Sequence, residues 1–181
     1  MNLEEKTINE KLIYESSFLS FKVEDVLLPN GSTSKRAIVV HPGASVIVPI
    51  DENQNVIMVK QFRKPLNKVI LELPAGKLDD GEDPLNCAKR ELEEETGYTS
   101  EQLIKLTEIY TTPGFSNEVI HVFLASNLKE GNTNTDVDEF VEVIKLPLKK
   151  VVEMVMNGEI KDAKTIIGLL LAEKYFKSDS K

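Results

Sequence analysis

The stretch that decides the fold is 76–98, which reads GKLDDGEDPLNCAKRELEEETGY. Its central part has the pattern of an α-helix over 84–96. Asp83 is a suitable N-cap, Pro84 suits the first helical position, and Gly97 suits a left-handed cap. The residues between these signals are strong helix formers. We therefore expect one well-defined helix in this part of the chain.

Three carboxylates share one face of this expected helix. Glu91, Glu94 and Glu95 stand at positions i, i+3 and i+4. Leu85 and Leu92 lie on an adjacent stripe, which we expect to enter the core. At an effective dielectric constant of about 20, each pair of carboxylates about 5 Å apart costs on the order of 3 kcal/mol. Hard divalent cations, which prefer oxygen ligands, would relieve this repulsion.

Acidic runs are usually solvated helix faces, but the spacing here is more specific. The segment resembles the Nudix box, which reads G, five residues, E, seven residues, and R-E-U-x-E-E-x-G-U, where U is apolar. The fixed positions are met by Gly76, Glu82, Arg90, Glu91, Glu94, Glu95 and Gly97. Leu92 fits the first apolar position, whereas Tyr98 is an aromatic departure at the second. We expect this departure to affect packing after the helix rather than metal chemistry.

The resemblance implies an α/β fold, a Nudix α/β/α sandwich with a mixed sheet, and a reaction. Nudix hydrolases cleave a nucleoside diphosphate linked to another moiety, using Mg²⁺ or Mn²⁺. By resemblance, Glu91 and Glu95 are the principal metal ligands, and Glu94 contributes directly or through water. The backbone carbonyl of Ala75 often completes the set.

The resemblance also implies roles for other polar residues. Arg90, four residues before Glu94, should orient the carboxylates. Glu82 either reaches a metal or fixes its own loop through backbone N–H groups, and both roles stay open. The catalytic base of the family lies in a mobile loop outside the box. Glu139 is our candidate, with two near rivals in Asp136 and Asp138.

Residues outside the box point to the substrate. ADP-ribose pyrophosphatases are similar in carrying a proline some 16 residues beyond the last box glycine, and Pro113 has this spacing from Gly97. An ordinary Pro-Gly turn is the alternative interpretation. The runs VVHPGASVIVPI, VKQFRKP and ELPAGKLD also look like this subfamily. Hydrolysis of ADP-ribose to AMP and ribose 5-phosphate is therefore expected. The alternatives are another nucleotide sugar, such as a GDP-sugar, and a non-catalytic ADP-ribose-binding module.

The subfamily resemblance implies substrate contacts as well. Arg63 matches an arginine that touches the diphosphate, and Arg36 is a second candidate; either is alternatively a surface charge. Phe18 or Phe21 would stack on adenine, as aromatic residues of the N-terminal region do in similar enzymes. Core packing of these phenylalanines is an equal alternative.

The rest of the chain suggests two parts. Residues 1–42 have the pattern of antiparallel strands, and in related pyrophosphatases such a region is exchanged across a dimer, so we expect a homodimer. Residues 43–181 form the expected hydrolase domain. The runs expected as strands are 44–50, 56–62, 69–73, 103–111, 118–125 and 140–146. Polar residues 129–138 should form a loop, and two helices should close the chain, after Pro147 and after Asp162.

Composition excludes several classes of protein. A net charge of −8 argues against binding to a nucleic-acid backbone. One cysteine, Cys87, and two histidines leave neither a disulfide framework nor a zinc cluster. No run approaches the roughly 20 apolar residues of a membrane span, and no signal peptide is evident. A cytoplasmic protein without a membrane or nucleic-acid partner is expected.

Overall fold

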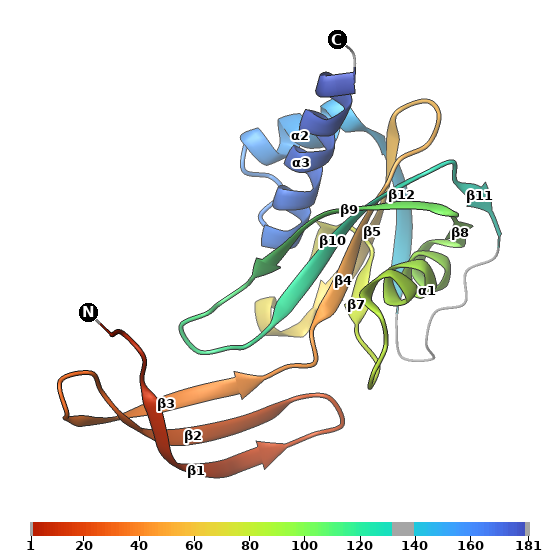
Figure 1. Ribbon diagram of the computed structural model, residues 1–181. Helices are drawn as coiled ribbons and strands as arrows, with labels where there is room; N and C mark the ends of the chain where they lie inside the picture. Colours follow the sequence, from red (N-terminus) through yellow and green to blue (C-terminus); the bar gives the residue numbers. More distant parts are fainter. Residues whose placement is uncertain (1, 132–139, 180–181) are drawn as a thin grey trace. The chain divides into compact units, whose positions relative to one another are not determined.

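The computed structural model describes residues 2–131 and 140–179, which form two compact units (Figure 1). The first unit consists of Met1–Gly43 and Tyr110–Val119, and the second of Ala44–Ile109 and Ile120–Lys181. The first unit therefore adds Tyr110–Val119 to the N-terminal segment that the sequence set apart.

A three-stranded antiparallel sheet forms most of the first unit. Its strands are β1 (Lys6–Glu15), β2 (Ser20–Leu27) and β3 (Thr33–Val40), in the order β1-β2-β3. The turn between β2 and β3 contains Gly31 at a φ of 84°, a conformation that glycine adopts without strain. Every residue of β1 is exposed. The predicted antiparallel meander is thus confirmed, with β1 as an open edge strand.

Residues 110–119 join this sheet through the backbone. The Val39 N–H donates to the Phe115 carbonyl at 2.7 Å, and the Asn117 N–H donates to the Val39 carbonyl at 3.3 Å. The His41 N–H donates to Asn117 Oδ1 at 2.8 Å. These bonds connect positions more than seventy residues apart in sequence.

Two larger sheets and three helices form the second unit. The mixed sheet has the order β7-β4-β10-β9, in which β4 is parallel to β10 and antiparallel to β7. Its strands are β4 (Ala44–Pro49), β7 (Ala75–Lys77), β9 (Gln102–Tyr110) and β10 (Val119–Ser126). The other sheet is antiparallel, with the order β12-β5-β6. Its strands are β5 (Asn55–Arg63), β6 (Lys68–Glu72) and β12 (Val141–Pro147).

Shorter elements and helices complete the second unit. A 3₁₀ turn, η1 (Lys64–Leu66), links β5 to β6. Two-residue strands β8 (Tyr98–Thr99) and β11 (Lys129–Glu130) pair with each other, so the stretch predicted as a loop from Lys129 begins with a short strand. The helices are α1 (Pro84–Thr96), α2 (Leu148–Met156) and α3 (Ala163–Asp179). No helix in the described ranges is long and apolar enough to cross a membrane.

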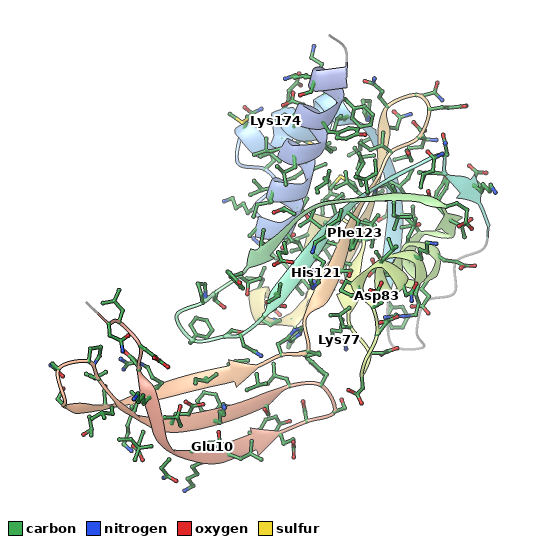
Figure 2. All side chains as sticks on the ribbon, in the orientation of Figure 1. Glu10, Lys77, Asp83, His121, Phe123 and Lys174 are labelled. Carbon is green, nitrogen blue, oxygen red and sulfur yellow. The ribbon has the colours of Figure 1, made fainter. Side chains whose placement is uncertain are left out.

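The core divides into two halves on the two faces of β4. Because side chains alternate along a strand, Val46 and Val48 join a cluster that includes residues of α2 and α3. Ile47 belongs to a second cluster, with Leu92 of α1 and Phe123 of β10. Figure 2 labels Phe123 on β10. Helices therefore cover both faces of a mixed sheet, which confirms the predicted α/β/α sandwich.

The prediction that Leu85 of α1 enters the core was wrong. The side chain of Leu92 is completely buried, as expected, but Leu85 is 37% exposed. The small cluster beneath α1 contains Ala88 and Leu92, from the later turns of the helix. Leu85 belongs to the first turn, beyond the end of this cluster.

Gly168 allows α3 to approach β4 closely. A Cβ atom at this position would lie 2.7 Å from Leu73 Cδ1 and 3.0 Å from Val48 Cγ2. We predict that Gly168→Ala lowers the free energy of unfolding by about 1–3 kcal/mol through overpacking, although alanine is favoured over glycine in a helix by up to about 1 kcal/mol. Denaturant unfolding would measure the change. Gly114→Ala is the control, since its Cβ would meet nothing within 4 Å; a more stable Gly168→Ala protein would contradict the packing argument.

The turn between β4 and β5 contains a carboxylate with a lowered pKa. Burial raises the pKa of Asp51, but bonds from Lys145 at 2.6 Å and from the Asn55 and Asn53 N–H groups bring it to about 2. Because the folded-state pKa lies below the ordinary value of 3.8, Asp51 stabilises the fold well above that pH. This contribution is lost as the pH falls through about 2.

We therefore predict that Asp51→Asn is less stable than the wild type at neutral pH and that the two proteins converge in stability as the pH approaches 2. Unfolding free energies measured between pH 7 and pH 2 would test this. Glu52→Gln, a change at an exposed neighbour in the same turn, should keep the wild-type pH dependence. A constant difference between Asp51→Asn and the wild type across this range would refute the prediction.

Candidate active site

Both ends of helix α1 are capped as the sequence predicts. The Asp83 carboxylate accepts hydrogen bonds from the Leu85 and Asn86 N–H groups, at 2.9 and 3.4 Å. Gly97 adopts a φ of 74°, and its N–H donates to the Glu93 carbonyl at 2.8 Å. These caps fix the start and end of the helix, and with them the direction of its carboxylates.

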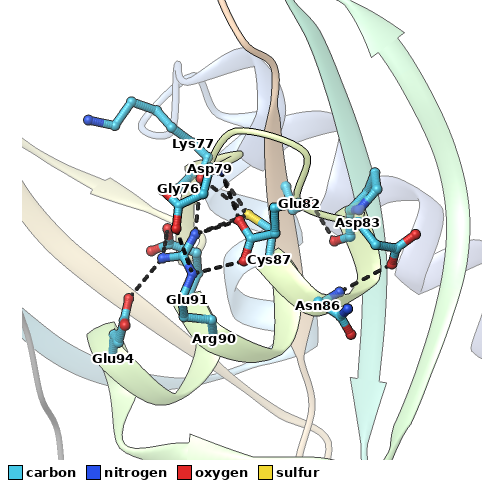
Figure 3. Close-up of polar contacts among 12 residues, drawn as sticks. Gly76, Lys77, Asp79, Glu82, Asp83, Asn86, Cys87, Arg90, Glu91 and Glu94 are labelled. Carbon is cyan, nitrogen blue, oxygen red and sulfur yellow. Dashed lines mark hydrogen bonds and ion pairs between the residues drawn. The ribbon is translucent and has the colours of Figure 1, made fainter. Parts of the chain in front are cut away.

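Glu91 packs directly over Gly76 of strand β7 (Figure 3). The Glu91 side chain is almost fully buried, since the residue is only 7% exposed. A Cβ atom at Gly76 would lie 1.8 Å from Glu91 Oε1. Any larger residue at position 76 would therefore displace the Glu91 carboxylate.

Glu95 binds the same strand at Ala75, the residue before Gly76. It is 3% exposed, and its Oε2 accepts a hydrogen bond from the Ala75 N–H at 2.9 Å. Glu94 is half-buried on the same helix. The structure thus brings together the three predicted carboxylate ligands and the residue whose carbonyl was expected to join them.

The Arg90 guanidinium lies at the centre of this cluster (Figure 3). Its Nε and Nη2 donate to the two oxygens of Glu82 at 3.0 and 2.9 Å. Its Nη1 donates to Glu91 Oε1 at 2.7 Å and to Glu94 Oε2 at 3.0 Å, and Nη2 also donates to the Lys77 carbonyl at 3.1 Å. The Glu82 carboxylate raises the pKa of Arg90, and Glu91 and Glu94 add to this effect. Arg90 is therefore placed to orient three carboxylates at once.

Glu82 holds the loop before the helix. Its Oε2 accepts a hydrogen bond from the Asp79 N–H at 3.0 Å, and the bond from Arg90 keeps the pKa of Glu82 below its ordinary value. The bond from the Asp79 N–H is of the kind that a loop-fixing role requires, and contact between Glu82 and a metal stays a prediction.

Cys87 lies beneath the same loop. Its thiol is positioned to donate to the carbonyls of Gly76 and Lys77, and burial raises its pKa to about 11. A thiol with such a pKa is protonated at neutral pH and is a poor nucleophile.

The chemistry of the cluster fits a hard divalent cation. Arg90 binds three carboxylates, those of Glu82, Glu91 and Glu94, and Arg63 acts electrostatically on a fourth, Glu95. The four carboxylates still outnumber these cations, and Glu91 and Glu95 are buried, where excess negative charge is unfavourable. All the candidate ligand atoms are oxygens, as Mg²⁺ and Mn²⁺ prefer. Within residues 2–131 and 140–179, no three acidic, histidine or cysteine side chains already surround a common point as a finished metal site. The bonds to Arg90 account for the directions in which three of the carboxylates point.

Arg63 belongs to the same unit as the helix. It ends strand β5, and its guanidinium binds the buried carboxylate of Glu72. Glu72 is the main cause of the raised pKa of Arg63, and Glu95 contributes to it. Arg63 therefore lies within electrostatic reach of the carboxylate cluster, and its contact with substrate stays a prediction.

The other candidate substrate residues belong to the first unit. Arg36 binds Glu5 through Nε at 2.8 Å and Nη2 at 2.5 Å. Pro113 is exposed in a turn in which the Phe115 N–H donates to the Thr112 carbonyl.

The aromatic candidates also lie in the first unit. Phe18 is partly exposed and contacts His41 edge to face, with ring centroids 6.0 Å apart. Phe21 is half-buried in β2. Their roles toward a substrate stay predictions. Glu139, the candidate base, and its rivals Asp136 and Asp138 lie outside the residues that the structure describes.

Sequence reasoning missed Glu72 and its partner Lys164. Glu72 stands in the run ELPAGKLD, directly after the apolar residues 69–71 at the end of strand β6. A charge that ends an apolar run is a signal, because a buried charge needs a partner. Its partner lies 92 positions away, so the sequence did not identify it.

The chain is similar in sequence and in fold to known proteins. The family model described as NUDIX domain matches residues 39–167. An ADP-ribose pyrophosphatase of Bacillus subtilis (strain 168) is 51% identical over 166 residues, covering 91% of this chain and 90% of its own. A methanol dehydrogenase activator of Bacillus methanolicus is 48% identical over 168 residues, covering 92% and 91%. A crystal structure of an ADP compounds hydrolase has a TM-score of 0.87 and 21% identity, covering 99% of this chain and 98% of that one; this likeness shows the fold.

Proposed function

This chain belongs to the Nudix family, and we propose that it is a Mg²⁺-dependent hydrolase that cleaves the pyrophosphate of ADP-ribose into AMP and ribose 5-phosphate in the cytoplasm. Mn²⁺ is the alternative metal. The observation that carries the proposal is the pair of buried carboxylates, Glu91 and Glu95, against strand β7. The substrate assignment is supported by the similarity to the Bacillus subtilis pyrophosphatase. The net charge of −8 suits a small-molecule partner better than a nucleic acid.

Glu91, Glu95 and Glu94, with the Ala75 carbonyl, would hold the metal. A bound divalent cation supplies two effects: it neutralises charge on the diphosphate and lowers the pKa of water. Arg90 keeps the carboxylates oriented, and Glu82 fixes the loop beside them. Arg63 would bind the diphosphate through its guanidinium.

In the proposed reaction, water attacks one phosphorus of the diphosphate. The bond from that phosphorus to the bridging oxygen breaks, and the bridging oxygen leaves with the other phosphate. Glu139 would accept the proton from the attacking water. The products are AMP and ribose 5-phosphate.

The first test is turnover of ADP-ribose by the purified protein in the presence of Mg²⁺, with AMP and ribose 5-phosphate quantified. We expect EDTA to abolish turnover and excess Mg²⁺ or Mn²⁺ to restore it, because the reaction needs a divalent cation. Turnover that persists in EDTA after dialysis would contradict metal dependence.

A panel of nucleotide sugars distinguishes the alternatives. Preference for a GDP-sugar would keep the mechanism and replace the substrate. Binding of ADP-ribose without turnover of any member would favour a non-catalytic ADP-ribose-binding module.

We propose further that the protein is a homodimer through residues 1–42. Strand β1 is a fully exposed edge strand that carries Ile8, Leu12, Ile13 and Tyr14, all at least half exposed. Exposed edges with apolar side chains are usually covered in soluble proteins. Analytical ultracentrifugation should give twice the chain mass, and Leu12→Lys should shift the protein toward monomer. A wild-type monomer at micromolar concentration would overturn this proposal.

A further inference from the structure

Glu72 is a buried carboxylate outside the box helix. It ends strand β6 and is 1% exposed. An ionised carboxylate at such a site is strongly unfavourable unless cations bind it. Two cations do so: Arg63 from strand β5 and Lys164 from the first turn of α3. Glu72 therefore connects a strand of the antiparallel sheet to the C-terminal helix.

The contact with Arg63 is a two-pronged charge-assisted bond. Nε donates to Glu72 Oε1 at 2.7 Å, and Nη2 donates to Oε2 at 2.9 Å. In the strand register, Arg63 lies opposite Lys68, whereas Glu72 lies opposite Val59. Since a strand rises about 3.3 Å per residue, Arg63 must reach back along the sheet to meet Glu72. A planar fork of this kind fixes the direction of a long side chain that is 39% exposed.

Lys164 extends the contact to helix α3. Its Nζ donates to Glu72 Oε2 and, at 3.0 Å, to Asp162 Oδ2. Asp162 Oδ2 also accepts hydrogen bonds from the Thr165 N–H and hydroxyl, at 3.1 and 2.7 Å. The Thr165 hydroxyl oxygen accepts from the Leu73 N–H at 2.9 Å. The start of α3 is thus bonded to the residue that follows Glu72 as well as to Glu72 itself.

This network lies beside the candidate active site. Arg63 interacts electrostatically with Glu95 of the box as well as with Asp162. Leu73 is followed by Pro74 and then by Ala75, whose N–H binds Glu95. Arg63 is the residue proposed to contact the diphosphate. A displacement of its guanidinium would therefore weaken that contact.

We propose that Glu72 and Lys164 are positioning residues that act through Arg63: they hold its guanidinium in the orientation that binds the substrate diphosphate. This inference rests on the proposed function, in which Arg63 binds a diphosphate. In this proposal Lys164 acts on the substrate through Glu72 and Arg63, and α3 thereby becomes part of the substrate-binding apparatus.

The first arm of the test needs no turnover. NMR of the Arg63 Nε–Hε group reports whether the guanidinium is held, because a bonded N–H exchanges slowly with water. We expect Lys164→Met and Glu72→Gln to increase this exchange, and Lys161→Met to leave it unchanged. Lys161 is an exposed lysine three residues earlier and serves as the matched control. Unchanged exchange in both Lys164→Met and Glu72→Gln would overturn the proposal.

The second arm measures kinetics on ADP-ribose. We expect Lys164→Met to raise KM about tenfold while kcat changes less than about twofold, since a ground-state binding contact is loosened. Lys164→Arg, which keeps the charge, should restore most of the affinity. In an Arg63→Gln background, Lys164→Met should have no further effect on KM, because its route to the substrate is already removed. An equal rise in both backgrounds would show that Lys164 does not act through Arg63.

The two arms separate this proposal from the proposed function. If the wild type hydrolyses no nucleotide sugar, the proposed activity fails. The positioning proposal is then tested separately, by the change in the Arg63 NMR signal on addition of ADP-ribose. A shift of that signal, lost in Lys164→Met but kept in Lys161→Met, would support positioning. No shift in the wild type would overturn it.

Discussion

Glu95→Gln should lower kcat for ADP-ribose by at least about a thousandfold, equal to about 4 kcal/mol. Glu95 is 3% exposed and lies against strand β7, where its carboxylate is proposed to bind the metal. Glutamine has nearly the same shape, and its side-chain oxygen can still accept the hydrogen bond from the Ala75 N–H. The substitution therefore removes the negative charge while keeping the packing of helix and strand.

Glu93→Gln is the matched control for this experiment. Glu93 is two residues earlier on the same helix, but its side chain is exposed, and we expect wild-type kcat and KM. Circular dichroism and thermal unfolding should show that both variants fold. A Glu95→Gln protein that keeps more than a tenth of wild-type kcat would exclude Glu95 as a principal metal ligand.

Gly76→Ala should lower kcat strongly and change the melting temperature little. The new Cβ would lie 1.8 Å from Glu91 Oε1, so the Glu91 carboxylate must move. Displacing a catalytic group by about 1 Å costs on the order of a hundredfold in rate, and we expect kcat to fall by about that factor. The clashing atoms are the end of a flexible side chain, so the melting temperature should change by only a few degrees.

Gly168→Ala provides the opposite case. Its Cβ would meet the packed side chains of Leu73 and Val48 rather than a carboxylate, so stability should fall while kcat at low temperature stays near the wild-type value. The two alanine variants together show whether the clash at Gly76 acts on Glu91. Equal kcat for Gly76→Ala and the wild type would mean that Glu91 has no role in turnover.

The sequence predicted the local features of the site well because their causes are local. Asp83, Pro84 and Gly97 determine the helix limits through caps and backbone geometry, which depend on neighbouring residues. The i, i+3, i+4 spacing then places Glu91, Glu94 and Glu95 on one face. The confirmed α/β/α sandwich follows from apolar strands on both sides of this helix in the sequence.

Features that depend on distant partners were beyond the sequence. Leu85 lies on the apolar stripe but outside the cluster beneath the helix, and that cluster includes Ile47 of β4 and Phe123 of β10, which are distant from the helix in sequence. Glu72 binds Lys164 across 92 positions, and no short-range pattern links them. The approach of Glu91 to Gly76 is of the same kind: the motif contains both residues, but the fold determines their separation.

The first unit is built from two segments that are far apart in sequence, and this affects how the chain folds during synthesis. Strands β1, β2 and β3 make only neighbouring pairings, so they can form as soon as they leave the ribosome. Their bonds from Val39 and His41 must wait for Phe115 and Asn117, which are translated some seventy residues later. The nascent N-terminal sheet therefore spends that interval with an incomplete edge, and slowing translation between residues 43 and 110 should expose it longer to chaperones and to self-association.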